Sequence, residues 1–394
     1  MAAVRIGVAE RRARLAARHH LAPPARAAGI VEVVRDMLAL HGTDPSTVYL
    51  SAWARVRSPT AIELDRALYD DRVLVRMLGM RRTMFVVPVE LVPVVQAACT
   101  SAIAVVERRR TVQFLEEAGF AGDVPAWLAE VEEATVAALK VRGSALSTEL
   151  SEDEPRLSQR IVLARGKSYE GSQSVASRVL PLLAADGRVV RGRPRGSWTS
   201  GGQYWWSTVE AWLPDGVPSL EVEQARVELA RGWLRAFGPA PVADLKWWSG
   251  WTLGQTRAAL AGIGAVEVDL DGVAGVALAD DLAPTPVPEP HAVLLPGLDP
   301  TVMGWQARAW FLGEHGGALF DTNGNAGPTV WWEGRVVGGW AQRKDGEVVV
   351  RLLEDVGGEA AAAVAAEAAR LQEWLGPVRV TPRFRTPLER ELTS

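Results

Sequence analysis

The sequence predicts an α+β protein in which three helical units, each ending in a two-stranded hairpin, precede an antiparallel sheet covered by a helix. A short pattern of glycine, alanine, an acidic residue and leucine occurs twice in the middle of the chain, and each copy precedes helical periodicity and then alternating residues joined by a turn. The last part of the chain alternates in short runs bounded by Gly and Asp-Gly turns, which is typical of antiparallel strands. Helices followed by a two-stranded wing are typical of the winged variant of helix-turn-helix. The predicted fold is therefore a tandem of three winged helix-turn-helix modules with a C-terminal antiparallel β-sheet/helix domain.

The composition narrows the class of protein. Of 394 residues, 48% are hydrophobic and 23% are charged, an ordinary globular balance that makes disorder and fibres poor candidates. One cysteine, Cys99, excludes an internal disulfide framework and a cysteine-based zinc site, and the five histidines lack ligand spacing, so we expect no metal and no cofactor. No apolar run approaches the ~20 residues that span a bilayer, and charges fill the N-terminus where a secretion signal would be apolar. We therefore expect a cytoplasmic, nucleoid-associated monomer without membrane contact.

Residues 1–125 are predicted to hold the first module. Apolar residues in ARAAGIVEVVRDMLAL recur at helical spacing, and the pattern stops at His41-Gly42. Gly42 suits a left-handed residue just past a helix end, and Asp44-Pro45 suits an N-cap followed by proline at the first helical position. The stretch LALHGTDPSTVYLSAWARV therefore predicts a helix, a corner and a second helix. TAIELDRALYD adds a third helix, and VLVRMLGMRRTMFVVP adds two strands around a basic turn.

Residues 126–215 and 216–285 are predicted to be the second and third modules, because an internal repeat relates them. RGSALSTELS and FGPAPVADLKWWSG align so that Gly143, Ala145, Glu149 and Leu150 match Gly238, Ala240, Asp244 and Leu245. The first copy is followed by the helix SQSVASRVLPLLAADG and the hairpin RVVRGRPRGSWTSGGQYWW, and the second by TLGQTRAALAGIG and AVEVDLDGVAGVAL. Three such units in series form an array that can wrap a duplex.

Residues 286–394 are predicted to form the C-terminal domain. LAPTPVPEPHAVLLPG is a proline-rich connection, and GPTVWWEGRVVGGWAQRKDGEVVVRLL predicts an antiparallel sheet. The alanine-rich segment GEAAAAVAAEAARLQEWLG predicts a helix on that sheet. Most of the sixteen tryptophans are expected in the core.

Arginine clusters are the candidate nucleic-acid contacts. The formal net charge of −4 argues against coating of nucleic acid by bulk electrostatics, but a local basic surface can still hold a phosphate backbone. The predicted DNA contacts are Arg81 and Arg82 in the basic turn, Arg188, Arg191, Arg193 and Arg195 in the second hairpin, and Trp198 as a candidate wedge between bases. The alternative is a mobile basic loop without a partner.

In this order the segments resemble the AlkZ/YcaQ group of winged-helix DNA glycosylases, bacterial enzymes that excise bulky alkylated bases and unhook interstrand crosslinks. LALHGTDPSTVYLSAWAR occupies the place of the family's catalytic Gln-x-Gln or Gln-x-Asp corner, and VLVRMLGMRRTMFVVP resembles the segment that usually reads Arg-Gly-Thr-Leu-His-Leu. FGPAPVADLKWWSG, LLPGLDPTVMGWQAR and PTVWWEGRVVGGW are similar to later family segments. The resemblance covers nearly the whole chain and implies a double-stranded DNA partner that carries damage.

The chain departs from the family pattern at the positions where the family carries its catalytic residues. Around Gly42 the resemblance places His41 and Thr43 where the family has its two catalytic side chains, with Asp44 next, and Arg82 and Phe85 replace the Gly and His of the second segment. Excision of an N7-alkylated purine starts from a cationic base, so the leaving group needs no proton and the enzyme must expose the lesion, stabilise an oxocarbenium-like sugar and orient a water.

The three corner residues are not equally suited to that chemistry. Asp44 near a helix N-terminus is the better candidate base if it is not consumed as a cap, while a helix C-terminus should favour protonated His41. Thr43 is expected to hydrogen-bond the water or to cap the helix. The candidate catalytic residues are therefore His41, Thr43 and Asp44. The alternatives are a catalytically inactive DNA-binding regulator or damage sensor, and a scaffold whose modules contact proteins.

Overall fold

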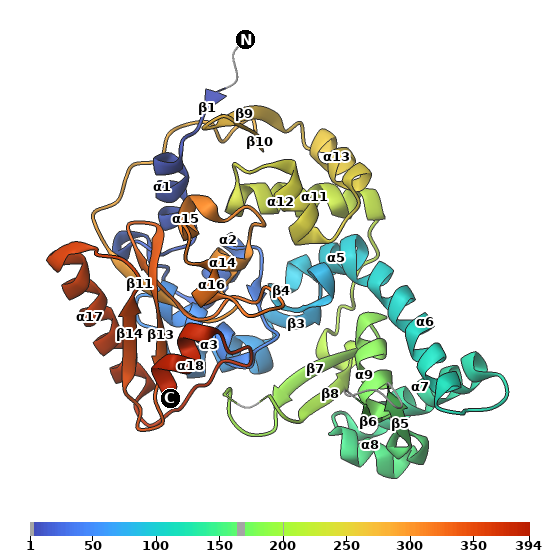
Figure 1. The fold of residues 1–394 in the computed structure, drawn as a ribbon. Helices are drawn as coiled ribbons and strands as arrows, with labels where there is room; N and C mark the ends of the chain where they lie inside the picture. The colour runs from blue at the N-terminus through green and yellow to red at the C-terminus, as the bar shows by residue number, and fades with distance from the viewer. Residues whose placement is uncertain (1–3, 164–169, 200) are drawn as a thin grey trace.

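The computed structural model describes residues 4–163, 170–199 and 201–394, and it is a mixed α and β protein. In Figure 1 the second unit, drawn in green, forms a lobe that the long helix α6 (Ser101–Glu117) connects to the rest of the molecule. The C-terminal sheet lies on the opposite side of the molecule, and the third unit lies above the first. Among the described residues, the order helix, short strand or bridge, helix, helix and hairpin occurs three times.

The first of these units surrounds the corner. It comprises α2 (Ile30–Asp36), β2 (Leu40–His41), α3 (Pro45–Arg55), α4 (Ala61–Asp65), the π-helical turn η2 (Arg66–Asp70), β3 (Leu74–Leu78) and β4 (Met84–Pro88). The three strands form an antiparallel sheet in the order β2-β4-β3, in which His41 is opposite Phe85. The helix predicted to reach residue 40 ends at Asp36, and the left-handed residue is Leu38 with φ 66° rather than Gly42. The corner is therefore a strand that joins the sheet, because residues 40–42 find backbone partners on β4.

A long helical stretch follows the first unit. Val89–Glu117 comprises η4 (Val89–Leu91), α5 (Val92–Val95), the π-helical turn η5 (Gln96–Thr100) and α6, with a short basic turn, η3 (Met80–Arg82), preceding β4. Contrary to expectation, this stretch is long and apolar enough to cross a membrane by length and composition. Core helices of soluble proteins meet the same criterion, so the finding is weak evidence for a membrane segment. Here α5 and η5 pack against α11 (Val222–Phe237), and α6 packs against two helices of the second unit.

The second unit has its own hydrophobic core. Its elements are α7 (Val124–Arg142), α8 (Ser147–Asp153), η6 (Pro155–Ser158), β5 (Arg160–Leu163), β6 (Gly171–Ser174), α9 (Ala176–Ala185), β7 (Val189–Pro194), β8 (Tyr204–Thr208) and α10 (Val209–Trp212). The core also includes Leu115 of α6. Asp123 caps α7 by accepting from the Ala126 amide, and Gly143 with φ 74° ends it. The antiparallel hairpin β5–β6 lies between α8 and α9, an addition that the sequence pattern did not indicate.

The third unit contains α11, α12 (Val242–Ser249), α13 (Leu253–Gly262), β9 (Val266–Leu270) and β10 (Val273–Ala277), and the N-terminal strand β1 (Val4–Arg5) pairs in parallel with β9. Between β1 and α2 lie α1 (Val8–Arg18) and η1 (Pro23–Ala25). The repeated alanines perform the same task in both units, since Ala145 bridges to Trp206 and Ala240 bridges to Val276. Leu150 and Leu245, the repeated leucines, are both fully buried.

The C-terminal part is built on a four-stranded antiparallel sheet. Its strands, in order, are β11 (Ala292–Leu295), β12 (Thr329–Trp332), β13 (Arg335–Gln342) and β14 (Val348–Leu352), with α14 (Pro300–Met303), α15 (Ala309–Leu312) and α16 (Gly316–Leu319) between β11 and β12. The helices α17 (Gly357–Leu375) and α18 (Pro387–Thr393) pack on this sheet. The predicted sheet and alanine-rich helix thus occur where the pattern indicated.

Buried polar contacts connect this C-terminal part to α3. Asp299, before α14, receives two guanidinium hydrogen bonds from Arg55 at 2.8 and 2.6 Å, and both side chains are fully buried. The Ser51 hydroxyl donates to the same carboxylate at 2.7 Å, and the Thr47 hydroxyl donates to the Gly297 carbonyl at 2.7 Å. The helix that follows the corner is therefore fixed along its length by the C-terminal part.

Candidate functional site

A cleft of about 330 Å³ opens where three parts of the molecule meet beside the corner. The first sheet, the first turns of α9, the β7–β8 hairpin and the segment around Arg383 contribute to its wall. The described residues that line it include no Asp or Glu; they are Thr43, Arg76, Met84, Ser147, Ser174, Ala176, Ser177, Leu180, Pro181, Arg191, Gly201, Gly202, Gln203, Tyr204, Trp206 and Arg383. The cleft is thus basic and polar, with three arginines on its wall.

Two of these arginines are held against one aromatic ring. The guanidinium carbons of Arg76 and Arg191 each lie 5.0 Å from the centre of the Tyr204 ring, and Arg191 is also 5.0 Å from the Trp206 ring. Arg76 is 7% exposed, donates to the Tyr204 hydroxyl at 3.1 Å and donates to the Gly42 carbonyl. Burial, together with the positive charges of Arg76 and Arg383, lowers the pKa of Arg191 to about 10. The Arg191 guanidinium therefore remains charged at neutral pH.

His41 lies behind the cleft wall and not in it. Its side chain is 3% exposed, and its ring centre lies 5.1 Å from that of Phe85. Burial, together with the positive charge of the nearby Arg81, lowers the pKa of His41 to about 3. The expected protonated imidazole is therefore wrong, because His41 is in a buried strand and not at a helix C-terminus. The Thr43 amide faces its Nδ1 at a long 3.5 Å.

Thr43 is the corner residue that reaches the cleft. Its hydroxyl oxygen accepts from the Met84 amide at 3.3 Å. A hydroxyl has one proton to donate and two lone pairs, so this contact leaves the proton and one lone pair for a ligand or water. The Thr43 side chain is half-buried, which makes it accessible from the cleft.

Asp44 caps α3, as its sequence context predicts. Oδ1 accepts from the Ser46 amide at 3.0 Å and the Ser46 hydroxyl at 2.8 Å, while Oδ2 accepts from the Arg383 amide at 2.9 Å. The side chain is 7% exposed, and it lines a small cavity between α3 and the C-terminal sheet, away from the cleft. The condition attached to Asp44 as a base, that it not be consumed as a cap, is not met in this structure.

Comparison with known proteins places this arrangement in a family. The family model described as AlkZ-like, DNA glycosylase AlkZ-like, matches residues 34–374. The chain belongs to the AlkZ-like DNA glycosylase family. Its fold is similar to that of the Streptomyces sahachiroi DNA glycosylase AlkZ, with a TM-score of 0.72 and 22% sequence identity over 96% of this chain and 100% of that chain. The comparison with curated proteins gives no match.

In this AlkZ-like chain two of the four predicted wing arginines contact carboxylates of the protein itself. Arg193 pairs with Asp65 at 3.0 Å and Asp70 at 3.1 Å, which docks the hairpin on the first unit. Arg188 pairs with Glu133 at 2.8 Å. Arg195 is exposed, and its guanidinium donates to the Gln203 side chain at 3.2 Å. Of the four predicted wing arginines, Arg191 alone lines the cleft.

The other predicted DNA contacts lie outside the cleft. The Arg81 guanidinium stacks 3.7 Å from the Trp247 ring centre, and Arg82 pairs with Glu107 at 2.8 Å. Trp198, the candidate wedge, is half-buried and stacks on Tyr49 with ring centres 4.7 Å apart. In this conformation Trp198 fastens the hairpin to the first unit.

Sequence reasoning missed Arg76, Arg383 and Tyr204. Arg76 was detectable, because it is a lone charged residue in the apolar strand β3. Arg383 follows the corner by more than three hundred positions, so its place in the cleft follows from tertiary structure alone.

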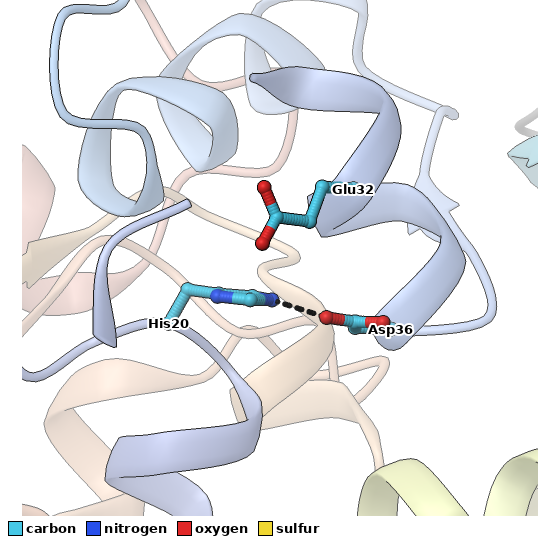
Figure 2. A group of neighbouring side chains, drawn as sticks. All are labelled: His20, Glu32 and Asp36. Atoms are coloured by element: carbon cyan, nitrogen blue, oxygen red, sulfur yellow. Dashed lines mark hydrogen bonds and ion pairs between the residues drawn. The ribbon is translucent and has the colours of Figure 1, made fainter. Parts of the chain in front are cut away.

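The described residues contain one group with the composition of a metal site, formed by His20, Glu32 and Asp36 (Figure 2). The His20 ring contacts the Ala25 carbonyl through Nδ1 at 2.8 Å and Asp36 through Nε2 at 2.9 Å, while Glu32 accepts from the Ala28 amide at 2.9 Å. The contact between the His20 ring and Asp36, together with these backbone hydrogen bonds, accounts for the grouping without a metal ion. The group joins the end of α1 to α2 and does not line the cleft.

Two buried histidines make the stability of this AlkZ-like chain sensitive to mild acid. Burial lowers the pKa of both His19 and His41 to about 3, whereas an unfolded histidine titrates near 6.5. Between these values the unfolded state binds more protons, so the stabilisation is complete above about pH 6.5 and is lost as the pH falls. We expect the free energy of unfolding, measured with urea, to fall below that pH by up to about 1.4 kcal/mol per pH unit for each histidine.

The variant His41→Gln isolates one of these contributions. The variant is expected to halve the slope of the free energy of unfolding against pH between pH 6 and 5, a range in which most unfolded carboxyl groups are already ionised. An unfolding free energy that is constant from pH 7 to 5 would contradict the neutral, buried state of both rings.

Proposed function

We propose that this chain binds double-stranded DNA through three winged-helix modules and hydrolyses the N-glycosidic bond of N7-alkylated purines, with crosslinked purines as further substrates. The observation that carries the proposal is the cleft: it is lined by Thr43 of the corner where the family resemblance locates catalysis, and by three arginines, with no carboxylate among the described residues of its wall. Such a wall attracts a phosphate backbone.

The absence of an acid or base from the described cleft wall suits this substrate class. An N7-alkylated purine is already cationic, so its departure requires no proton from the enzyme. What remains is to extrude the nucleotide, at a cost of a few kcal/mol, and to orient a water toward the sugar. We propose that the free proton and lone pair of the Thr43 hydroxyl perform the second task, with neutral His41 as a positioning residue behind the Thr43 backbone.

The helix α9 supports the DNA-binding part of the proposal. Ser177 and Pro181 on its first turns line both the cleft and a second open groove of about 460 Å³, whose wall includes Arg82, Arg110 and Arg178. In a winged-helix module the helix before the wing is the one that enters a groove. A duplex lying along α9 would bring one strand to the cleft.

The test uses a duplex with a single N7-alkylguanine, and it measures abasic-site formation beside duplex binding at several salt concentrations. Abasic sites that accumulate with enzyme, together with affinity that falls steeply with salt, are the expected result. Duplex binding that does not change with salt would contradict phosphate recognition and favour a scaffold that contacts proteins.

A second candidate, a DNA-binding regulator or damage sensor without catalysis, is favoured by one observation. The carboxylate nearest the corner, Asp44, already accepts three hydrogen bonds in its cap. Salt-sensitive duplex binding without excision of small or bulky adducts would select this candidate.

A further inference from the structure

We propose that Arg76, Arg191 and Arg383 hold one phosphodiester of the lesion-bearing strand, and that this phosphate supplies the negative charge that the cleft wall lacks. The inference rests on the proposed function, because it names the DNA group that the same cleft recognises. It concerns a binding site assembled from β3, the β7–β8 hairpin and the C-terminal segment, which are far apart in the sequence.

The first argument is that these arginines have no acidic partner among the described residues, whereas their neighbours do. Arg193, two positions after Arg191, contacts two carboxylates, and Arg188 contacts another. Arg76 donates to uncharged oxygens, and buried Nε of Arg191 has no hydrogen-bond partner. A desolvated guanidinium without a counter-charge is unfavourable, so the cluster is suited to receive an anion.

The second argument is that the guanidiniums of Arg76 and Arg191 are held in place before any ligand binds, while the exposed side chain of Arg383 is kept beside them by its backbone. Tyr204 contacts Arg76 and Arg191 through its ring, and its hydroxyl also accepts from Arg76. The Arg383 amide donates to Asp44 Oδ2, and its guanidinium is 3.5 Å from the Thr43 carbonyl. Guanidinium groups fixed in this way recognise phosphate with little loss of side-chain freedom.

The third argument concerns charge during the reaction. The N7-alkylated nucleotide carries one positive charge, which moves from the base to the oxocarbenium-like sugar as the base leaves neutral, and three uncompensated arginines on the same wall would oppose that charge. A bound phosphodiester neutralises the arginines and places negative charge beside the sugar. The substrate would thus contribute the anion that other active sites draw from a carboxylate.

The experiment replaces single phosphates near the site with neutral methylphosphonates. A duplex carrying a stable abasic-site analogue is synthesised as a set, with one linkage neutralised in each member, and its affinity is measured for wild type, Arg191→Gln and Arg383→Gln. The control is Arg351→Gln, which removes an equal charge from β14, where Arg351 pairs with Glu391 outside the cleft. Arg383→Gln retains the backbone amide that donates to Asp44 Oδ2.

We expect one linkage whose neutralisation weakens wild-type binding about tenfold or more, and which has little further effect in Arg191→Gln or Arg383→Gln. In these two variants the dependence of log affinity on log salt should fall by about one unit. Arg191→Lys should recover part of the affinity, and Arg351→Gln should respond to every linkage as wild type does.

The proposal would be overturned if, at every linkage, the loss of affinity from neutralising the phosphate simply added to the loss from substituting the arginine. Additive losses would show that the arginines and that phosphate act independently. Single-turnover excision separates this outcome from failure of the proposed function. Coupling at one linkage without excision would support the phosphate site and contradict the proposed glycosylase activity. Excision together with additive losses of affinity would support the glycosylase activity and contradict the phosphate site.

Discussion

Replacement of Arg55 by methionine is expected to lower the free energy of unfolding by about 3–5 kcal/mol. The Arg55 guanidinium donates to both oxygens of Asp299 and to the Thr301 hydroxyl at 2.8 Å, and both ionised side chains are fully buried. Methionine fills similar volume but leaves the Asp299 carboxylate charged and buried without its counter-ion. Urea unfolding at neutral pH measures the loss.

The double variant Arg55→Met/Asp299→Leu distinguishes the buried charge from lost packing. Because apolar pairs of similar volume often replace buried ion pairs without penalty, the double variant should recover most of the stability. The exposed pair of Arg5 and Asp271 provides the control, and Arg5→Met should cost less than about 1 kcal/mol. A double variant as unstable as Arg55→Met would show that the surrounding hydrogen bonds, and not the unpaired charge, dominate.

The same pair adds an acid-sensitive contribution. Burial works to raise the pKa of Asp299, but the charge and hydrogen bonds of Arg55 outweigh it and hold that pKa below its usual range. For a carboxyl group with a depressed pKa, the stabilisation is present above the unfolded value near 3.9 and is lost as the pH falls through the folded value. This loss therefore begins at lower pH than that of His19 and His41.

Thr43→Val is expected to reduce single-turnover excision of N7-alkylguanine by about 10²–10³-fold, the range found when one positioned polar group is removed from an active site. Valine preserves the shape but removes the hydroxyl that faces the cleft. It also removes the acceptor for the Met84 amide, so folding is checked by urea unfolding. Thr43→Ser retains the hydroxyl and should retain most of the activity.

The matched control for Thr43 is Asp44→Ser. Serine is itself a good N-cap, so α3 should form and duplex affinity should persist. If Asp44 acts only as a cap, excision by Asp44→Ser stays within a few-fold of wild type. Excision that survives in Thr43→Val and disappears in Asp44→Ser would make Asp44 the base and overturn the role proposed for Thr43.

The sequence predicted those parts of the fold that depend on local or repeated patterns. The cap at Asp44, the equivalent positions of Ala145 and Ala240, and the alternating strands of the C-terminal sheet all follow from residue types at fixed spacings. The predicted protonation of His41 was wrong, because the pKa of its ring depends on whether the corner is a helix end or a buried strand. Periodicity does not separate a short strand from the last turn of a helix.

The candidate site was predictable only in part. The location of Thr43 came from the resemblance, and Arg191 came from the composition of the hairpin. The sequence could not indicate which wing arginines are neutralised, since Asp65 and Asp70, the partners of Arg193, come from another unit. Arg383 was unpredictable for the same reason: its neighbours in space are remote in sequence.

The hydrogen bond from the Arg383 amide to Asp44 also has a consequence for biosynthesis. It joins residues 339 positions apart, and Trp374 makes a second such contact by donating to the Pro59 carbonyl at 2.8 Å. Contacts of this sequence separation form late, and domains fold in order as the ribosome releases them. The first unit therefore emerges long before both oxygens of Asp44 have their hydrogen-bond donors, and a nascent chain whose Arg383 is still inside the ribosome lacks that residue in the cleft. DNA recognition by this site is expected only after Arg383 has left the ribosome.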